Sequence, residues 1–127
     1  MAVVIRAAHY PGRAPIAAYG NGGFRFAGMS HRGSILCLPS GIYGWQAPAA
    51  DALDEESLAM VFAEADAIEI LLVGTGDRLV PLLPNVRTRF RAEKIVAEPM
   101  ATGAAVRTFN VLLAEERAVA AVLIAVD

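Results

Sequence analysis

The aliphatic segment 67–73, AIEILLV, restricts the possible folds more than any other part of the chain. It follows a stretch with helical spacing of apolar residues and is left through the glycines of GTGD. A short apolar run of this kind is typical of a central strand that is covered on both faces. A helix is then expected from Pro84, which suits a first helical turn, to about Glu93, and KIVAEP at 94–99 returns as a strand. The order strand, helix, strand predicts a parallel, right-handed βαβ unit.

Strands joined by hairpins are predicted in the N-terminal third of the chain. Its glycines and prolines oppose helix formation, and its apolar residues alternate with polar ones. The expected strands lie in four segments, namely 1–23 (an initial strand and loop), 24–26, 35–37 and 41–46. The second and third of these are expected to form a hairpin whose turn is Ser30-His31-Arg32-Gly33, with Gly33 at the positive-φ position.

Two further helices are predicted from apolar residues at helical spacing. The first has Asp54 as its N-cap and four apolar residues at positions i, i+3, i+4 and i+7, namely Leu58, Val61, Phe62 and Ala65. The second spans about 102–116 and leads into a final strand, AVAAVLIAV, at 118–126. Because hairpins connect the N-terminal part and crossovers connect the C-terminal part, the sequence predicts an α/β class with a mixed sheet. The length of 127 residues predicts one domain, 1–127.

Charge and hydropathy exclude some classes of partner and favour others. The formal net charge is -2 and the pI is about 5.6, so no basic field is available to hold a nucleic-acid backbone. The chain is 56% hydrophobic with a mean hydropathy of +0.47, which favours an unusually apolar surface or interface. A contact with a partner protein or with a second copy of the chain would each account for this excess.

Neither a metal site nor a cofactor is expected from the sequence. Cys37 is the single cysteine, which excludes an intramolecular disulfide and a paired-cysteine metal site. His9 and His31 lie far apart in sequence and do not have the spacing of a zinc motif. The first residues lack a secretory signal, and the apolar run 118–126 has nine residues, where a membrane helix needs about 20. We therefore expect a cytoplasmic protein that is at most peripheral on a membrane.

The Gly74-Thr75-Gly76 turn lies where open α/β sheets bind ligands, but it lacks a nucleotide motif. The dinucleotide fingerprint requires a third glycine where this chain has Leu79, and the next helix starts too late to present its N-terminus to the glycines. A tight turn is therefore favoured over a phosphate cradle. A second group, the basic side chains Arg87, Arg89, Arg91 and Lys94, shares one short helix. This group is either a solvated face or a docking surface for an acidic partner or for anionic lipid headgroups.

Two segments resemble a known family in combination, namely LLVGTGDRLVPL at 71–82 and MATGAAVRTFNVLLAEERAVAAVLI at 100–124. They are similar to the Mth938-like family of small α/β proteins, which includes the mitochondrial respiratory complex I assembly factor three. The similarity extends over about 18–126, and YGNGGFRFAGMSHRGSILCLPSGIYGW at 19–45 is similar to the bacterial branch. The matching positions are Gly23, Phe24, Gly33, Ser34, Trp45, Gly74, Thr75, Gly76, Met100, Thr102, Ala105, Thr108, Asn110, Leu112, Glu115 and Arg117. The targeting segment of the mitochondrial members is absent, which suits a bacterial, cytoplasmic version.

The resemblance implies a three-layer α/β domain around a mixed sheet and a role without settled chemistry. The mitochondrial relative acts in building complex I at the inner membrane together with a partner assembly factor, and genes of bacterial relatives often lie beside those of the Sec machinery. The leading hypothesis is therefore a non-catalytic interaction or assembly protein that docks to complex I, to a Sec-associated component or to another inner-membrane complex.

Two alternatives remain open at this point. The chain could bind or convert a small anionic ligand in a pocket at the Gly74–Gly76 loop, or it could simply form a homo-oligomer. The residues expected to line a pocket or an interaction surface are Gly74, Thr75, Gly76, Thr102, Arg107, Thr108, Asn110, Glu115 and Arg117. For some of them a structural role is equally open: Thr102 would be an N-cap, and Glu115 with Arg117 would pair or fix the turn from helix to strand.

Overall fold

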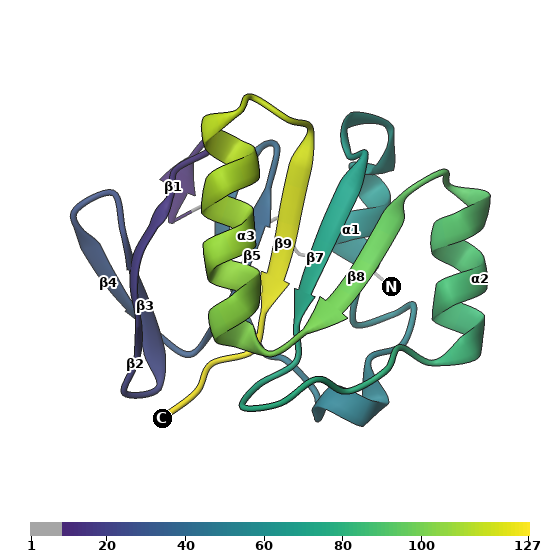
Figure 1. Cartoon of the computed structure of the whole chain (residues 1–127), viewed down its shortest axis with the longest axis horizontal. Coiled ribbons are helices and arrows are strands. Elements are labelled where there is room, and N and C mark those ends of the chain that lie inside the picture. The colour runs from purple at the N-terminus through teal and green to yellow at the C-terminus, as the bar shows by residue number, and fades with distance from the viewer. Residues whose placement is uncertain (1–8) are drawn as a thin grey trace.

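The computed structural model describes residues 9–127 and contains two β-sheets (Figure 1). The larger sheet has six strands in the order β1 (Tyr10–Pro11), β6 (Gly41–Trp45), β5 (Ser34–Leu38), β9 (Val119–Leu123), β7 (Ile70–Gly74) and β8 (Val96–Met100). The smaller sheet has three strands in the order β2 (Ile16–Gly20), β3 (Gly23–Phe26) and β4 (Met29–Arg32). The helices are α1 (Ala59–Ala63), α2 (Pro84–Ala92) and α3 (Thr102–Ala114), with short 3-10 turns η1 (Ala50–Ala52) and η2 (Ala65–Ala67).

The larger sheet is mixed, as predicted. Strand β7 pairs in parallel with both β8 and β9, whereas β5 pairs antiparallel with β9 and β6. The unit β7, α2, β8 is the predicted βαβ crossover, and it begins with the aliphatic segment that motivated the α/β assignment. No helix among residues 9–127 is long and apolar enough to cross a bilayer.

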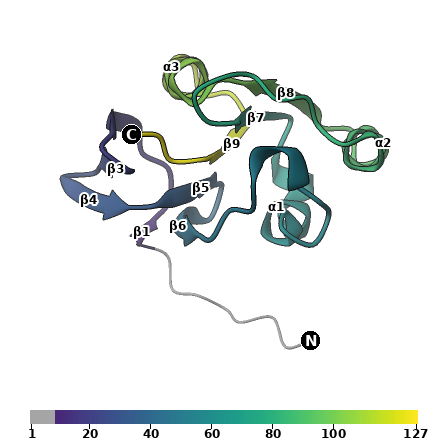
Figure 2. The same ribbon diagram turned by 90° about the horizontal axis from the view of Figure 1, so that it is seen from below.

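Helices cover both faces of the larger sheet, as Figure 2 shows from below. On one face, α1 and α2 contribute Val61 and Phe90 to a core that includes Leu71 of β7. On the other face, α3 contributes Phe109 to a second core that includes Leu72. The smaller sheet adds its buried phenylalanines to this second core. Leu71 and Leu72 are consecutive and both fully buried, which is why the segment lacks polar alternation.

The predicted turn of the N-terminal hairpin is wrong. Residues 30–33 were expected to connect two strands, but residues 29–32 form strand β4, which pairs with β3. The actual turn is Ala27-Gly28, where both residues have positive φ (50° and 74°), as tight two-residue hairpin turns require. Gly33 does adopt a positive φ of 101°, but it lies where the chain passes from the smaller sheet to β5 of the larger one.

The helix predicted to start at Asp54 is shorter than expected. Asp54 and Ser57 do exchange the reciprocal hydrogen bonds of a capping arrangement, with Ser57 N–H donating to Asp54 Oδ1 at 2.8 Å and Asp54 N–H donating to Ser57 Oγ at 3.0 Å. The residues that follow form turns, and regular α-helix is limited to Ala59–Ala63. Leu58 and Val61 nevertheless point into the core, as their spacing predicted.

Candidate functional site

The carboxyl ends of β7 and β9 meet the start of α3, and Thr102 joins these three segments through hydrogen bonds. Thr102 is the first residue of α3, its side chain is fully buried, and Ala101 rather than Thr102 is the N-cap. Its Oγ1 donates to the carbonyl of Ile124 at 2.7 Å and accepts from the N–H of Gly76 at 2.9 Å. The N–H of Thr102 donates in turn to the carbonyl of Gly76 at 2.8 Å. The interpretation of Thr102 as an N-cap is therefore wrong, because its hydroxyl forms hydrogen bonds with Gly76 and Ile124 and not with the first turn of α3.

The glycine turn itself is closed by Thr75. The N–H of this residue donates to the carbonyl of Met100 at 2.8 Å, and its hydroxyl lies 2.6 Å from the carbonyl of Arg78. The same hydroxyl accepts from the N–H of Val80 at 3.0 Å. Packing favours glycine at position 74, because a Cβ there would lie 3.0 to 3.1 Å from atoms of Leu123 and Thr102.

These contacts leave the turn poorly suited to hold an anion. The amides of Thr75 and Gly76, which a phosphate cradle would present to a ligand, already donate within the protein. The adjoining hollow of about 560 Å³ is lined by two carboxylates, Asp51 and Asp77, and by only one basic group, Arg78. The geometry favours the tight turn over the phosphate cradle.

The remaining predicted residues of α3 lie along its sides and at its far end. Asn110 binds both backbone groups of Ile16 in β2, accepting from its N–H at 2.8 Å and donating to its carbonyl at 2.9 Å. Thr108 donates to the carbonyl of Ala104 within the same helix at 2.9 Å, and Arg107 is exposed. The 13 residues of α3 span roughly 20 Å, so the glycine turn and the end of the helix are well separated.

At that far end, Arg117 lies 4.0 Å from Glu69, so its ion pair is formed with Glu69 and not with Glu115. The turn from α3 to β9 is made by backbone bonds, including one from Arg117 N–H to the carbonyl of Leu112, and by Glu116 with a φ of 60°. The predicted residues therefore occupy three separate places and do not form one pocket.

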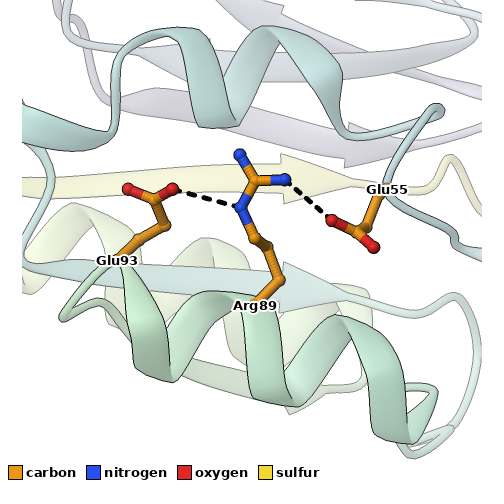
Figure 3. Close-up of polar contacts among 3 residues, drawn as sticks. All are labelled: Glu55, Arg89 and Glu93. Carbon is orange, nitrogen blue, oxygen red and sulfur yellow. Dashed lines mark hydrogen bonds and ion pairs between the residues drawn. The ribbon is translucent and has the colours of Figure 1, made fainter.

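The basic side chains of α2 divide between two sides of the helix. Arg89 donates to Glu55 at 2.7 Å and to Glu93 at 3.1 Å (Figure 3). Its guanidinium also lies over the ring of Phe62, 4.3 Å from the centroid. Hydrogen bonding to Glu55 first, and then to Glu93, raises the pKa of Arg89 above its ordinary value. This arginine joins α2 to the segment before α1, so we assign it a structural role.

Arg87 and Arg91 face the other way and line a hollow of about 310 Å³ between α2 and β8. We call this hollow the α2–β8 groove; its lining residues are Leu82, Arg87, Phe90, Arg91, Ile95, Val96 and Ala97. Val96 is 54% exposed, although it lies in a strand. Strand β8 is at the edge of the larger sheet, which explains this exposure. Sequence periodicity alone does not predict this groove, because locating the groove requires knowing which strand lies at the edge of the sheet.

Two histidines that are distant in sequence lie together. The rings of His9 and His31 are 4.7 Å apart, and both lie against the backbone of Gly44, where a Cβ would be 2.9 to 3.0 Å from their ring atoms. Burial, and secondarily the charge of His9, lowers the pKa of His31. Within residues 9–127 no group of three potential metal ligands from His, Cys, Asp and Glu is present. Burial raises the pKa of the Cys37 thiol, which lies in the core of β5.

Comparisons with known proteins agree with this architecture. The family described as "Protein of unknown function (DUF498/DUF598)" matches residues 16–124. A crystal structure of an outer membrane protein from Bartonella henselae is 58% identical, with a TM-score of 0.89, over 94% of this chain and 100% of that one. A solution structure from Bordetella pertussis, described as an Mth938-like domain, is 26% identical with a TM-score of 0.76, over 98% of this chain and 92% of that one.

Several relatives from different animals carry the same functional name, and one of them serves as an example. NADH dehydrogenase [ubiquinone] 1 alpha subcomplex assembly factor 3 of Xenopus tropicalis is 36% identical over 109 residues, which is 86% of this chain and 60% of that protein. The chain therefore spans about three fifths of the length of this curated relative.

Proposed function

The chain belongs to the DUF498/DUF598 family, and from that membership we propose that it is a non-catalytic binding protein that takes part in assembling a multisubunit complex. Relatives named as assembly factors of NADH dehydrogenase support an assembly role. On this proposal the complex is respiratory complex I or another inner-membrane assembly such as a Sec-associated one. The chain would reach it from the cytoplasm as a peripheral protein.

The observation that carries the proposal is that the backbone amides at the carboxyl end of β7 are already hydrogen-bonded within the protein. Open α/β sheets bind substrates and cofactors at this end, through free amides and side chains that converge on a cavity. Here Thr75 and Thr102 engage the turn and the start of α3 in internal hydrogen bonds. The backbone amides that would bind a small anionic ligand or substrate at this loop are therefore not free to do so. A role that depends on surface contact is then favoured over a reaction.

The α2–β8 groove is the surface that best suits such a contact. Phe90 and Ile95 form its buried floor, and Val96 exposes apolar area at its rim. Arg87 and Arg91 are exposed beside it, and neither takes part in an ion pair within the described residues. Arginine beside accessible apolar side chains is the composition that protein interfaces favour over the rest of a surface.

The test is affinity purification of the tagged full chain from its native host after mild crosslinking, followed by mass spectrometry. We expect subunits of complex I or of another inner-membrane complex to be enriched with the unaltered protein. The double variant Arg87→Gln/Arg91→Gln should lose this enrichment, because it removes both charges from the groove rim. The matched control is Arg107→Gln, which removes an exposed charge from α3 and should keep it.

Recovery of the protein without such subunits would contradict the proposed assembly role. Equal recovery with the groove variant would retain the role and place its surface elsewhere. Circular dichroism of both variants should match the unaltered protein, because none of the three arginine side chains forms an ion pair or a hydrogen bond with the described residues.

A further inference from the structure

Charge is distributed unevenly along this chain. The first 50 residues contain four arginines and neither Asp nor Glu, so that all 13 acidic residues lie after position 50. The smaller sheet, β2 to β4, is formed entirely from the acid-free part. A net charge of -2 for the whole chain therefore conceals a basic region at one end of the fold.

The outer face of the smaller sheet is a shallow basic hollow. The strand register places Ala18, Arg25 and Ser30 in one row across the three strands, and Gly20, Gly23 and Arg32 in the next row. The large side chains of β3, Phe24 and Phe26, point to the opposite face and are buried. The hollow has a volume of about 580 Å³, and the small residues leave its floor open between Arg25 and Arg32.

Both arginines of the hollow lack an acidic partner. The ion pairs among residues 9–127 engage Arg89 and Arg117, and no acidic residue lines the hollow. Arg25 and Arg32 are both exposed, so their charge is available to an approaching anionic group. Two uncompensated guanidinium groups beside one another create a local positive potential that an acidic ligand would neutralise.

The two edges of the smaller sheet differ in a way that matters for binding. At the β2 edge, Asn110 of α3 bonds to both backbone groups of Ile16, so the start of this edge is already occupied. At the other edge, β4 pairs with β3 on one side only, and none of the described strands pairs with its other side (Figure 1). An edge strand with unpaired backbone groups accepts an additional strand. The unpaired edge borders the basic hollow through Ser30 and Arg32.

We propose that β4 and the basic hollow bind an acidic, extended segment of a partner protein, which adds to the smaller sheet as a fourth strand. Backbone hydrogen bonds to β4 would hold the segment, and carboxylates at every second position would face Arg32 and Arg25. A second copy of this chain fits poorly. Antiparallel pairing of β4 with itself would place the Arg32 side chains of both copies on adjacent strands, with Arg25 one strand behind each, and like charges on adjacent strands are destabilising.

This surface is independent of the α2–β8 groove. Figure 1 shows the smaller sheet and α2 at opposite ends of the molecule, with the larger sheet between them. The proposal stands without any role in complex assembly, because it uses only the charge, the register and the unpaired edge of the smaller sheet.

The test uses the full chain, labelled with ¹⁵N, and a blocked synthetic peptide of about eight residues in which Glu and Val alternate, a length typical of a strand. Titration is followed by NMR at low salt, about 20 mM, where exposed charges are weakly screened. We expect shifts and slowed hydrogen exchange at the amides of Ser30 and Arg32. Affinity should fall about tenfold in Arg25→Gln/Arg32→Gln, and a peptide with Gln in place of Glu should bind with similarly reduced affinity.

The matched control is Arg87→Gln/Arg91→Gln, which removes the same charge from the opposite end of the molecule and should leave peptide affinity unchanged. The NMR spectrum of each variant shows whether it remains folded, so a loss of binding can be assigned to the surface. The proposal is overturned if the unaltered protein does not bind the peptide, if the shifts map away from β4, or if the two double variants bind it equally. It is also overturned if Arg25→Gln/Arg32→Gln only dimerises through β4, since the arginines would then serve to prevent self-pairing.

Discussion

Replacement of Thr102 by valine tests whether one hydroxyl holds the carboxyl end of the sheet closed. Valine has nearly the same shape and a similar helix propensity, so the change removes the hydroxyl with little other effect. The N–H of Gly76 and the carbonyl of Ile124 then lose the partners that lie 2.9 and 2.7 Å away. Both residues are half-buried, so water replaces these bonds only in part.

The expected loss follows from those two groups. A backbone group left without a partner in a buried position costs about 1–3 kcal/mol, and partial exposure favours the lower end of that range. For two such groups we expect the free energy of unfolding to fall by about 2–3 kcal/mol. That is a substantial share of the total stability of roughly 5–15 kcal/mol that a domain has. Equilibrium unfolding in urea, followed by circular dichroism, should show a midpoint lower by about 1–2 M.

Thr108→Val is the control for this experiment. It makes the same substitution in the same helix, but the hydroxyl it removes bonds only to the carbonyl of Ala104, one turn earlier. We expect a loss of no more than about 0.5 kcal/mol. Thr102→Ser keeps the hydroxyl and should recover most of the stability. If Thr102→Val and Thr108→Val unfold within about 0.5 kcal/mol of one another, the role assigned to Thr102 is refuted.

Three other predictions concern residues outside the glycine turn. Asn110→Ala should lower the free energy of unfolding by about 1–3 kcal/mol, because it leaves both backbone groups of Ile16 unpaired. Hydrogen exchange of the β2 amides should also accelerate, and unchanged exchange there would contradict the role assigned to Asn110. Cys37 should resist a thiol reagent such as DTNB in the folded protein and react only in urea, because its thiol is buried and its pKa is raised; rapid labelling without urea would disprove this. The pKa of His31 is lowered in the folded protein, so unfolding takes up protons, and the free energy of unfolding should decline as the pH falls below the ordinary histidine pKa of 6.5. The variant His31→Gln should flatten this decline, and an identical pH profile for the variant would show that His31 is not responsible.

Local signals predicted the larger elements correctly. The aliphatic run became β7, and Pro84 became the first residue of α2, because burial on two faces and the helical preference for an N-terminal proline leave clear marks in sequence. The hairpin turn was misplaced because Ala27-Gly28 lacks the asparagine or aspartate that usually marks such turns, whereas Ser30-His31-Arg32-Gly33 has polar residues and a glycine.

The candidate site was less accessible to sequence reasoning because long-range contacts define it. Asn110 bonds to Ile16, which lies 94 positions earlier, and Thr102 bonds to Ile124 across the sheet. Neither contact has a local pattern that could distinguish a structural residue from a ligand-binding one. His9 and His31 are a similar case, since His9 precedes β1 of the larger sheet, His31 lies in β4 of the smaller sheet, and only the tertiary fold brings their rings together.

The sequence of the glycine turn suggests a ligand-binding loop, yet packing and backbone conformation account for its two glycines. Gly74 is fixed by the approach of Thr102 and Leu123, and Gly76 by a φ of 104°. Substitutions there change the fold before they change any contact with another molecule. Exposed residues without internal partners, such as Arg25 and Arg87, are under no such restraint, since removing their charge breaks no ion pair within the described residues. Among proteins of this fold, we therefore expect the residues that determine partner specificity to differ at these exposed positions. The residues of the glycine turn should stay the same, because the stability of the fold depends on them.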